Sequence, residues 1–187
     1  MKNLINIFSL LILGSLSTMA TDKKEAQILI DFSTVKIADW SAVNDGVMGG
    51  ISSGSFSTKD NKGIFSGSLS LENNGGFASI RHQLKTNPMK TSSHIHLRIK
   101  GDGRTYQFRV RASNKFDGIS YKYDFATVAN QWLDISIPIA DMKSTFRGRH
   151  MPSYTAPKAQ DIQQISFLLA DKKPGSFKLL IESISHL

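Results

Sequence analysis

The chain has 187 residues, of which 23 are Lys or Arg and 15 are Asp or Glu, and it contains no Cys. This length suits one domain, and a composition that is 40% hydrophobic and 20% charged excludes disorder, coiled coil and collagen as whole-chain structures. The lack of Cys excludes disulfide scaffolds, thiol catalysis, zinc ribbons and iron–sulfur sites.

The first twenty residues have the pattern of a secretory signal peptide. A short basic start precedes a run of mostly Leu, Ile and Phe over residues 4–16, and Thr18 and Ala20 are small residues at signal-peptidase spacing. The run is shorter than the ~20 residues that span a bilayer, and the first Arg is Arg81, unlike an Arg-rich transit peptide. We therefore expect residues 1–20 to be a cleaved bacterial signal peptide. The mature chain would be periplasmic or secreted, without stable membrane insertion.

The charge balance stays basic without these residues, which favours anionic partners such as phospholipid head groups, acidic glycans or nucleic acid. Outside the cytoplasm nucleic acid is the least expected of these partners. We therefore predict an anionic partner that is not a nucleic acid.

Beyond residue 27 the hydrophobic pattern has a period of two, which predicts strands rather than helices. Gly, Asn and Asp turn signals separate the alternating segments, and only residues 159–164 would hold a helical turn. Nine or ten short strands predict an all-β fold, an antiparallel sandwich or jelly roll, as a single domain over residues 25–187. The expected strands are residues 28–32, 56 onward, 64–71, 77–80, 94–100, 106–111, 121–125, 132–137, 165–169 and 177–181.

The most regular alternation flanks Gly101-Asp102-Gly103, which predicts a hairpin with Asp102-Gly103 as its two-residue turn. The expected inward pairs are Ile99 with Tyr106, Leu97 with Phe108 and Ile95 with Val110. Trp132 is expected in the same core.

The opposite face of this hairpin would gather basic residues. The expected outward residues are His94, His96, Arg98, Arg109 and Arg111. Like charges opposite one another cost stability, so nearby acids, Asp124 first among them, would relieve the face, or an anionic ligand would.

Several segments occur in an order that composition does not require. The first is Asn44-Asp45-Gly46-Val47-Met48-Gly49-Gly50, and the later ones are residues 63–67, 74–81, 101–109, 137–138 after Trp132, and 146–149. This order and spacing resembles the complex I intermediate-associated protein 30 family over essentially the whole mature chain.

The resemblance implies a galactose-binding-like β-sandwich and a non-enzymatic module. Mitochondrial members of the family are assembly factors for NADH:ubiquinone oxidoreductase and act as chaperone-like partners of its intermediates. The expected function is therefore an exported protein-interaction or assembly factor, although its export separates it from those members. The alternative is a carbohydrate-binding module for an anionic or cell-envelope glycan.

Two loops and the outward face supply the candidate binding residues. The candidates are Asn44, Asp45, Gly49, Gly50, Arg98, Arg109, Arg111, Arg147 and Arg149. The glycines of the first loop would let backbone N–H groups approach a ligand, or would simply form a tight turn with a bulge. The guanidinium groups suit carboxylate or phosphate partners, or structural ion pairs.

The sequence gives little support for catalysis or metal binding. His94 and His96 lie on one side of a strand, but no third ligand is suitably spaced and the adjacent Arg residues would repel a cation. The serines form no Gly-x-Ser-x-Gly elbow, and no carboxylate pair is placed for glycoside hydrolysis. We expect no enzyme, no cofactor and no metal.

Overall fold

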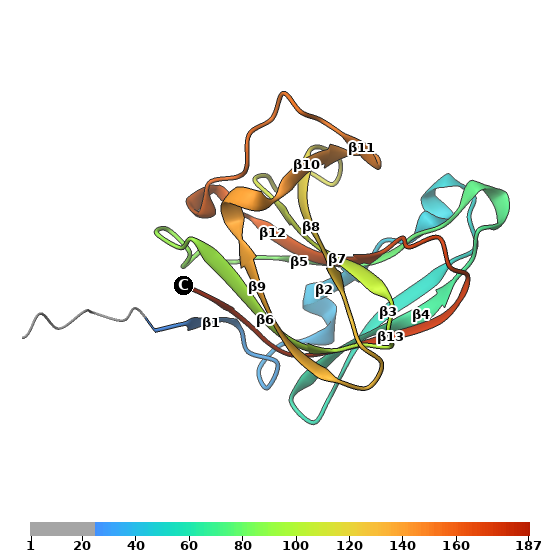
Figure 1. The fold of residues 1–187 in the computed structure, drawn as a ribbon, viewed down its shortest axis with the longest axis horizontal. Helices are drawn as coiled ribbons and strands as arrows, with labels where there is room; N and C mark the ends of the chain where they lie inside the picture. The colour runs from blue at the N-terminus through green and yellow to red at the C-terminus, as the bar shows by residue number, and fades with distance from the viewer. Residues whose placement is uncertain (1–24) are drawn as a thin grey trace, which may run out of the picture.

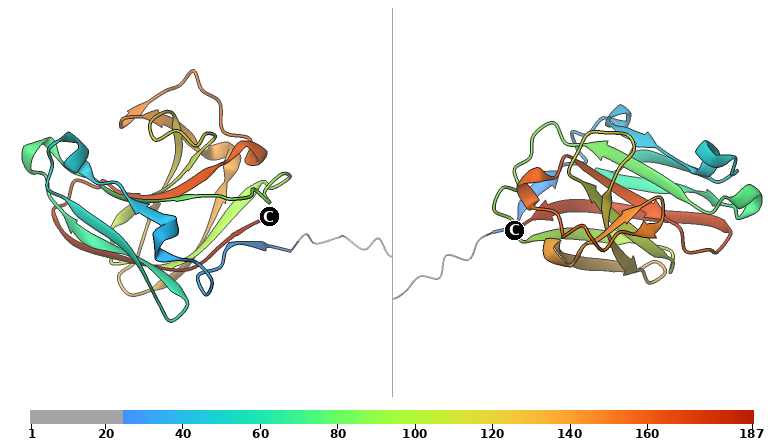
Figure 2. Two further views of the ribbon diagram at one scale, coloured as in Figure 1. Left: turned by 180° about the vertical axis from the view of Figure 1, so that it is seen from behind. Right: turned by 90° about the horizontal axis from the view of Figure 1, so that it is seen from above.

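The computed structural model describes residues 25–187, which form two antiparallel β-sheets packed face to face (Figures 1 and 2). The signal peptide predicted for residues 1–20 lies outside the described residues. The architecture confirms the predicted all-β sandwich of the galactose-binding-like type. Within the described residues, no helix has the length and apolarity needed to cross a membrane.

The first sheet has the strand order β3-β4-β13-β6-β9, with β1 also paired to β13. Its strands are β1 (Gln27–Ile30), β3 (Ser53–Lys59), β4 (Lys62–Leu69), β6 (His94–Lys100), β9 (Trp132–Pro138) and β13 (Gly175–His186).

The second sheet has the order β11-β10-β8-β7-β12-β5-β2. Its strands are β2 (Trp40–Ala42), β5 (Ala78–Gln83), β7 (Thr105–Arg111), β8 (Ser120–Ala126), β10 (Lys143–Phe146), β11 (Arg149–His150) and β12 (Gln164–Leu169).

In the described part of the chain, five 3₁₀ turns join the strands where one helical turn was expected. They are η1 (Ile37–Asp39), η2 (Asp45–Met48), η3 (Glu72–Asn74), η4 (Ile139–Asp141) and η5 (Ala159–Asp161). The expected turn within residues 159–164 corresponds to η5.

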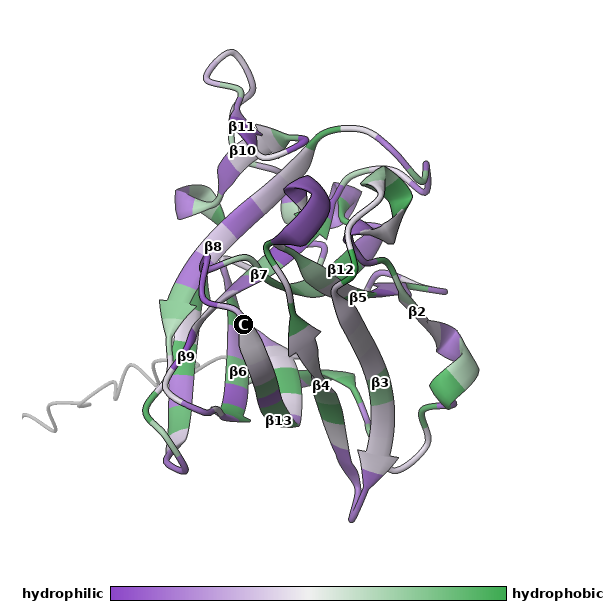
Figure 3. Ribbon diagram, turned by 90° about the vertical axis from the view of Figure 1, so that its right-hand side faces the viewer, coloured by the Kyte–Doolittle hydropathy of each residue, from purple (hydrophilic) through white to green (hydrophobic). Residues whose placement is uncertain are grey.

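The core lies between the sheets and is built by strand alternation. Along β6, Ile95, Leu97 and Ile99 are buried while their neighbours face outward, and β7 repeats this pattern with Tyr106 and Phe108. Figure 3 shows hydrophobic and hydrophilic residues alternating along β6 and β9. The six inward residues predicted for the two strands, which include Val110, are confirmed as core residues.

The predicted hairpin between β6 and β7 is wrong. β6 pairs with β13 and β9 in the first sheet, whereas β7 pairs with β12 and β8 in the second. Residues 101–104 therefore cross between the sheets, and none of the three expected inward pairs forms. The Asp102 carboxylate accepts hydrogen bonds from the Tyr106 hydroxyl (3.0 Å) and from the Lys178 backbone N–H (2.8 Å), so it anchors a crossover instead of a tight turn.

The prediction that these basic residues share one face is also wrong, because β6 and β7 belong to different sheets. His94, His96 and Arg98 lie on the outer face of the first sheet, and Arg109 and Arg111 lie on the outer face of the second. Asp124 forms its ion pair with Lys122 on its own strand (2.8 Å) and not with the arginines.

Trp132 is also misplaced by the prediction. Its ring is only partly buried and lies under the Arg98 guanidinium, 5.8 Å from Cζ to the ring centroid, on the outer face. Leu133, Ile135 and Ile137 pack against the core instead. The alternation of β9 is therefore set by the aliphatic residues, which leaves the preceding Trp132 outside.

These placements predict different losses of stability for two substitutions. Leu97→Ala should lower the free energy of unfolding by about 2–5 kcal/mol, because it leaves a cavity at a fully buried position. Trp132→Ala removes a partly buried ring and a cation–π contact of about 0.5–1 kcal/mol, so it should cost clearly less. Urea denaturation of both variants compares the losses. An equal or larger loss for Trp132→Ala would contradict its outer-face position.

Candidate functional site

The outer face of the second sheet gathers basic side chains from three strands, β5, β7 and β8. The strand register places Arg81 of β5, Ser166 of β12, Arg109 of β7 and Lys122 of β8 in one row across the sheet. The adjacent row contains Gln83, Gln164 and Arg111. Because alternate residues of a strand point to the same face, each row projects away from the core.

Loops above these rows form a groove of about 600 Å³, called the basic groove below. The 3₁₀ turn η2 contributes Val47 and Met48, which are 64% and 61% exposed. The residues that line the basic groove are Val43, Val47, Met48, Gly75, Gly76, Phe77, Arg81, Arg109, Arg111, Phe116, Asp117, Ser120, Arg147, Gly148, Leu168 and Ala170. The lining thus contains four guanidinium groups and one carboxylate.

Three of these arginines have neutral hydrogen-bond acceptors only. The Arg109 guanidinium donates to Gln107 Oε1 (2.9 and 2.6 Å), that of Arg111 to the Gly118 carbonyl (2.9 Å), and that of Arg81 to the Phe116 carbonyl (2.9 Å). None of the three forms an ion pair within residues 25–187. Arg147 does pair with Asp117 (2.7 Å) at the rim.

The electrostatics of the basic groove disfavour its own positive charges. Burial, together with the positive charge of Arg111, lowers the pKa of Arg81 to about 10 and that of Arg109 to about 10. Burial also lowers the pKa of Arg111. All three guanidinium groups stay protonated at neutral pH, so a bound anion would relieve both their desolvation and their mutual repulsion.

The loop of residues 44–50 has an internal structural role. The buried Asp45 carboxylate accepts hydrogen bonds from the backbone N–H of Ser52 (2.9 Å), Gly76 (2.7 Å) and Phe77 (3.3 Å), and from the Ser52 hydroxyl. A Cβ on Gly50 would lie 2.4 Å from Asp45 Cγ, so the position needs glycine. The 3₁₀ turn η2 places Val47 and Met48 in the lining of the basic groove.

Asn44 and Gly49, in the same loop, also have structural roles. Asn44 donates to the Gly54 carbonyl (3.1 Å) and accepts from the Ser79 backbone N–H (3.3 Å). Gly49 ends η2 with φ at +90°, a conformation that favours glycine.

The predicted site residues therefore separate into distinct places. Arg109, Arg111 and Arg147 line one groove, whereas Arg98 pairs with Asp134 and with Glu182 (3.5 Å) on the opposite sheet. Arg149 is exposed on β11 outside the groove lining.

The sequence reasoning missed Arg81 and Phe116. The Arg81 Cζ lies 5.1 Å from the centroid of the Phe116 ring, which is 66% exposed. Arg81 directly follows the expected strand of residues 77–80. Continuing the alternation of that strand by one residue puts Arg81 on the outward face, and this was the available signal. Phe116 had no periodic signal, because it lies in the loop before β8.

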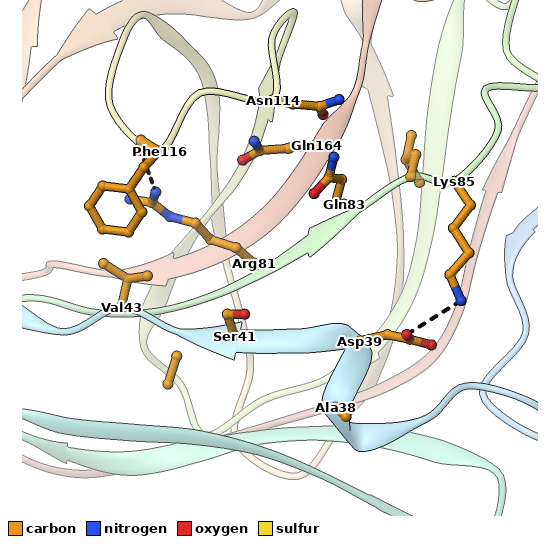
Figure 4. A pocket seen from close by; sticks show the side chains of 12 residues that line it. Ala38, Asp39, Ser41, Val43, Arg81, Gln83, Lys85, Asn114, Phe116 and Gln164 are labelled. Atoms are coloured by element: carbon orange, nitrogen blue, oxygen red, sulfur yellow. Dashed lines mark hydrogen bonds and ion pairs between the residues drawn. The ribbon is translucent and has the colours of Figure 1, made fainter.

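A second cavity of about 670 Å³ adjoins the basic groove and shares Val43, Arg81 and Phe116 with it. We call it the amide groove, because Gln83, Asn114 and Gln164 line it together with Ser41. Figure 4 shows the three amides gathered beside Arg81 and Phe116, with the Asp39–Lys85 ion pair (3.4 Å) at the other end.

The two histidines of β6 stack with their ring centroids 6.1 Å apart. Residues 25–187 contain no group of three or more His, Cys, Asp or Glu side chains that could hold a metal ion.

Comparison with known proteins gives one family and one fold. Residues 30–181 match the sequence profile of the Complex I intermediate-associated protein 30 family. A protein of Caenorhabditis briggsae, described as a probable mitochondrial complex I intermediate-associated protein 30, is 29% identical over 96 residues. That match covers 49% of this chain and only 28% of the relative's length.

Solved structures with the same fold include carbohydrate-binding domains. A family 11 carbohydrate-binding module of Clostridium thermocellum, in complex with a β-1,3-1,4-mixed-linked tetrasaccharide, has a TM-score of 0.66 at 19% identity, covering 87% of this chain and 95% of that one. An agarase has a TM-score of 0.56 at 12% identity, covering 87% of this chain and 24% of the agarase. These likenesses establish the fold alone.

Proposed function

The chain belongs to the complex I intermediate-associated protein 30 family, and on that premise we propose that it is a non-enzymatic module that binds an acidic glycan in the basic groove. The observation that carries the proposal is the set of three groove arginines that have no carboxylate partner among residues 25–187. Guanidinium groups offer donors only, in a planar fork that matches carboxylate and sulfate groups.

Two further observations support a glycan over a small free anion. The groove is within the size range of ligand sites, and its lining combines the arginines with the exposed ring of Phe116. The fold is shared with a module described in complex with a tetrasaccharide. The signal-peptide pattern of residues 1–20 supports a periplasmic or secreted location in a bacterium, where such polymers are accessible.

The test is the double variant Arg109→Gln/Arg111→Gln, titrated with polygalacturonate at two salt concentrations. The affinity should fall at least about ten-fold, because two charge-assisted hydrogen bonds are lost, and its salt dependence should flatten. Thermal stability should stay unchanged or rise, since the substitutions remove repulsion and no ion pair.

Arg98→Gln is the matched control, because it makes the same change on the opposite sheet. It should leave the affinity for polygalacturonate unchanged. Unchanged affinity in the double variant, or an equal loss in Arg98→Gln, would refute the proposed site.

A second candidate is a protein-interaction or assembly role, as the family name suggests. Its specific support is the pair of exposed apolar side chains Val47 and Met48 beside the basic groove. A pull-down from envelope extract at physiological salt tests it, and recovery of no protein partner would count against it.

A further inference from the structure

The two adjoining grooves differ in the ligand groups they can satisfy. The basic groove presents guanidinium groups, which only donate hydrogen bonds. The amide groove presents the side-chain amides of Gln83, Asn114 and Gln164 and the Ser41 hydroxyl, which both donate and accept. Sugar hydroxyl groups also donate and accept, so the amide groove matches an uncharged sugar better than an acidic one.

Gln164 presents its side-chain amide to a ligand in the amide groove. The residue is 8% exposed, yet its side-chain amide has no hydrogen-bond partner within the part of the chain that the structure describes. The amide nitrogen and oxygen stay accessible from the groove, so both are available to bond a ligand hydroxyl group.

Phe116 and Arg81 stand where the two grooves meet. The Arg81 guanidinium lies against the Phe116 ring at 5.1 Å, and most of that ring remains exposed. Both residues line both grooves, so a chain that passes from one groove to the other must cross them. An exposed aromatic ring at such a crossing can pack against the C–H face of a sugar.

We infer that the ligand is an acidic heteropolysaccharide, whose acidic unit binds in the basic groove while the adjoining neutral unit binds in the amide groove. This inference rests on the proposed function and specifies its substrate class. The ligand spans at least two unlike sugars, and the Arg81–Phe116 contact marks the linkage between them.

The test is calorimetric titration with three tetrasaccharides: one of alternating glucuronate and N-acetylglucosamine, one of galacturonate alone, and one of glucose alone. The wild-type chain should bind the alternating tetrasaccharide most tightly and the glucose tetrasaccharide least. Gln164→Leu should weaken binding of the alternating tetrasaccharide about ten-fold, since one ligand hydrogen bond is lost. It should leave binding of the galacturonate tetrasaccharide unchanged.

Gln164→Leu should fold normally, because it replaces an unpartnered amide by an apolar side chain of similar size, and thermal unfolding verifies this. Gln131→Leu, at an exposed position in the turn before β9, is the matched control and should bind as the wild type does. The inference is overturned if Gln164→Leu binds the alternating tetrasaccharide as tightly as the wild type does. It is also overturned if the substitution weakens binding of both acidic tetrasaccharides equally. In either case the proposed function still stands. If the wild type binds neither acidic tetrasaccharide, the proposed function falls with it.

Discussion

Asp45→Asn should lower the free energy of unfolding by about 3 kcal/mol or more, because an amide cannot accept all the hydrogen bonds that the carboxylate accepts. Three backbone N–H groups and the Ser52 hydroxyl point at the two carboxylate oxygens. In the variant, the new NH₂ group faces some of these donors, so buried groups lose their partner. Urea denaturation at pH 7 measures the loss.

The same substitution should flatten the acid limb of the stability curve. Burial raises the pKa of Asp45, but hydrogen bonds from Ser52 and from backbone N–H groups outweigh it and hold that pKa below its usual value of 3.8. A carboxyl with a lowered folded pKa stabilises the protein fully above its unfolded pKa, and this contribution is lost as the pH falls through the folded pKa. The wild type should therefore lose stability below about pH 4 more steeply than Asp45→Asn.

The control for both measurements is Asp60→Asn, in the exposed β3–β4 turn where φ is 51° and Asn is well tolerated. It should change the free energy of unfolding by less than about 0.5 kcal/mol, as surface substitutions usually do. A loss at Asp45 as small as that at Asp60, or an unchanged acid limb, would contradict the structural role of Asp45.

Comparison of β6 and β7 shows what the sequence can predict. Alternation along one strand is local, so Leu97 and Phe108 were placed in the core correctly whatever their partners. Strand partners are set by distant segments: β13 inserts between β4 and β6, and β12 inserts between β7 and β5. Local pattern carries no signal for these insertions, and a hairpin is the default for two adjacent strands.

The candidate site follows the same division. Arg109 and Arg111 were identified as binding residues because they share one strand face. Arg81 joins them because β12 lies between β5 and β7. Arg147 joins them from the turn between β10 and β11, at the edge of the same sheet. The strand register also puts Arg98 on the opposite sheet, which no single-strand pattern could indicate.

Arg104→Met should lower the free energy of unfolding by about 3–5 kcal/mol, the usual cost of removing one partner of a buried ion pair. The Arg104 guanidinium binds both oxygens of the Asp171 carboxylate (2.6 and 3.0 Å), and the side chains are 11% and 7% exposed. It also donates to the carbonyls of Gly175 (3.2 Å) and Ser176 (3.3 Å), which fixes the start of β13 beside the crossover of residues 101–104.

The pKa directions agree with this coupling. The hydrogen bonds with Asp171 raise the pKa of Arg104. Burial alone would raise the pKa of Asp171, but the hydrogen bonds that its carboxylate accepts, first those from Arg104, hold that pKa below its usual value. Without Arg104, the Asp171 carboxylate stays buried without its ion-pair partner and keeps the hydrogen bond from the Lys173 backbone N–H (3.2 Å). The double variant Arg104→Met/Asp171→Leu should therefore recover most of the loss, because it removes the charge together with its partner. Denaturant titration of the single and double variants measures the loss of unfolding free energy and its recovery. A loss below about 1 kcal/mol in Arg104→Met, as for a surface ion pair, would show that the pair does not hold the crossover.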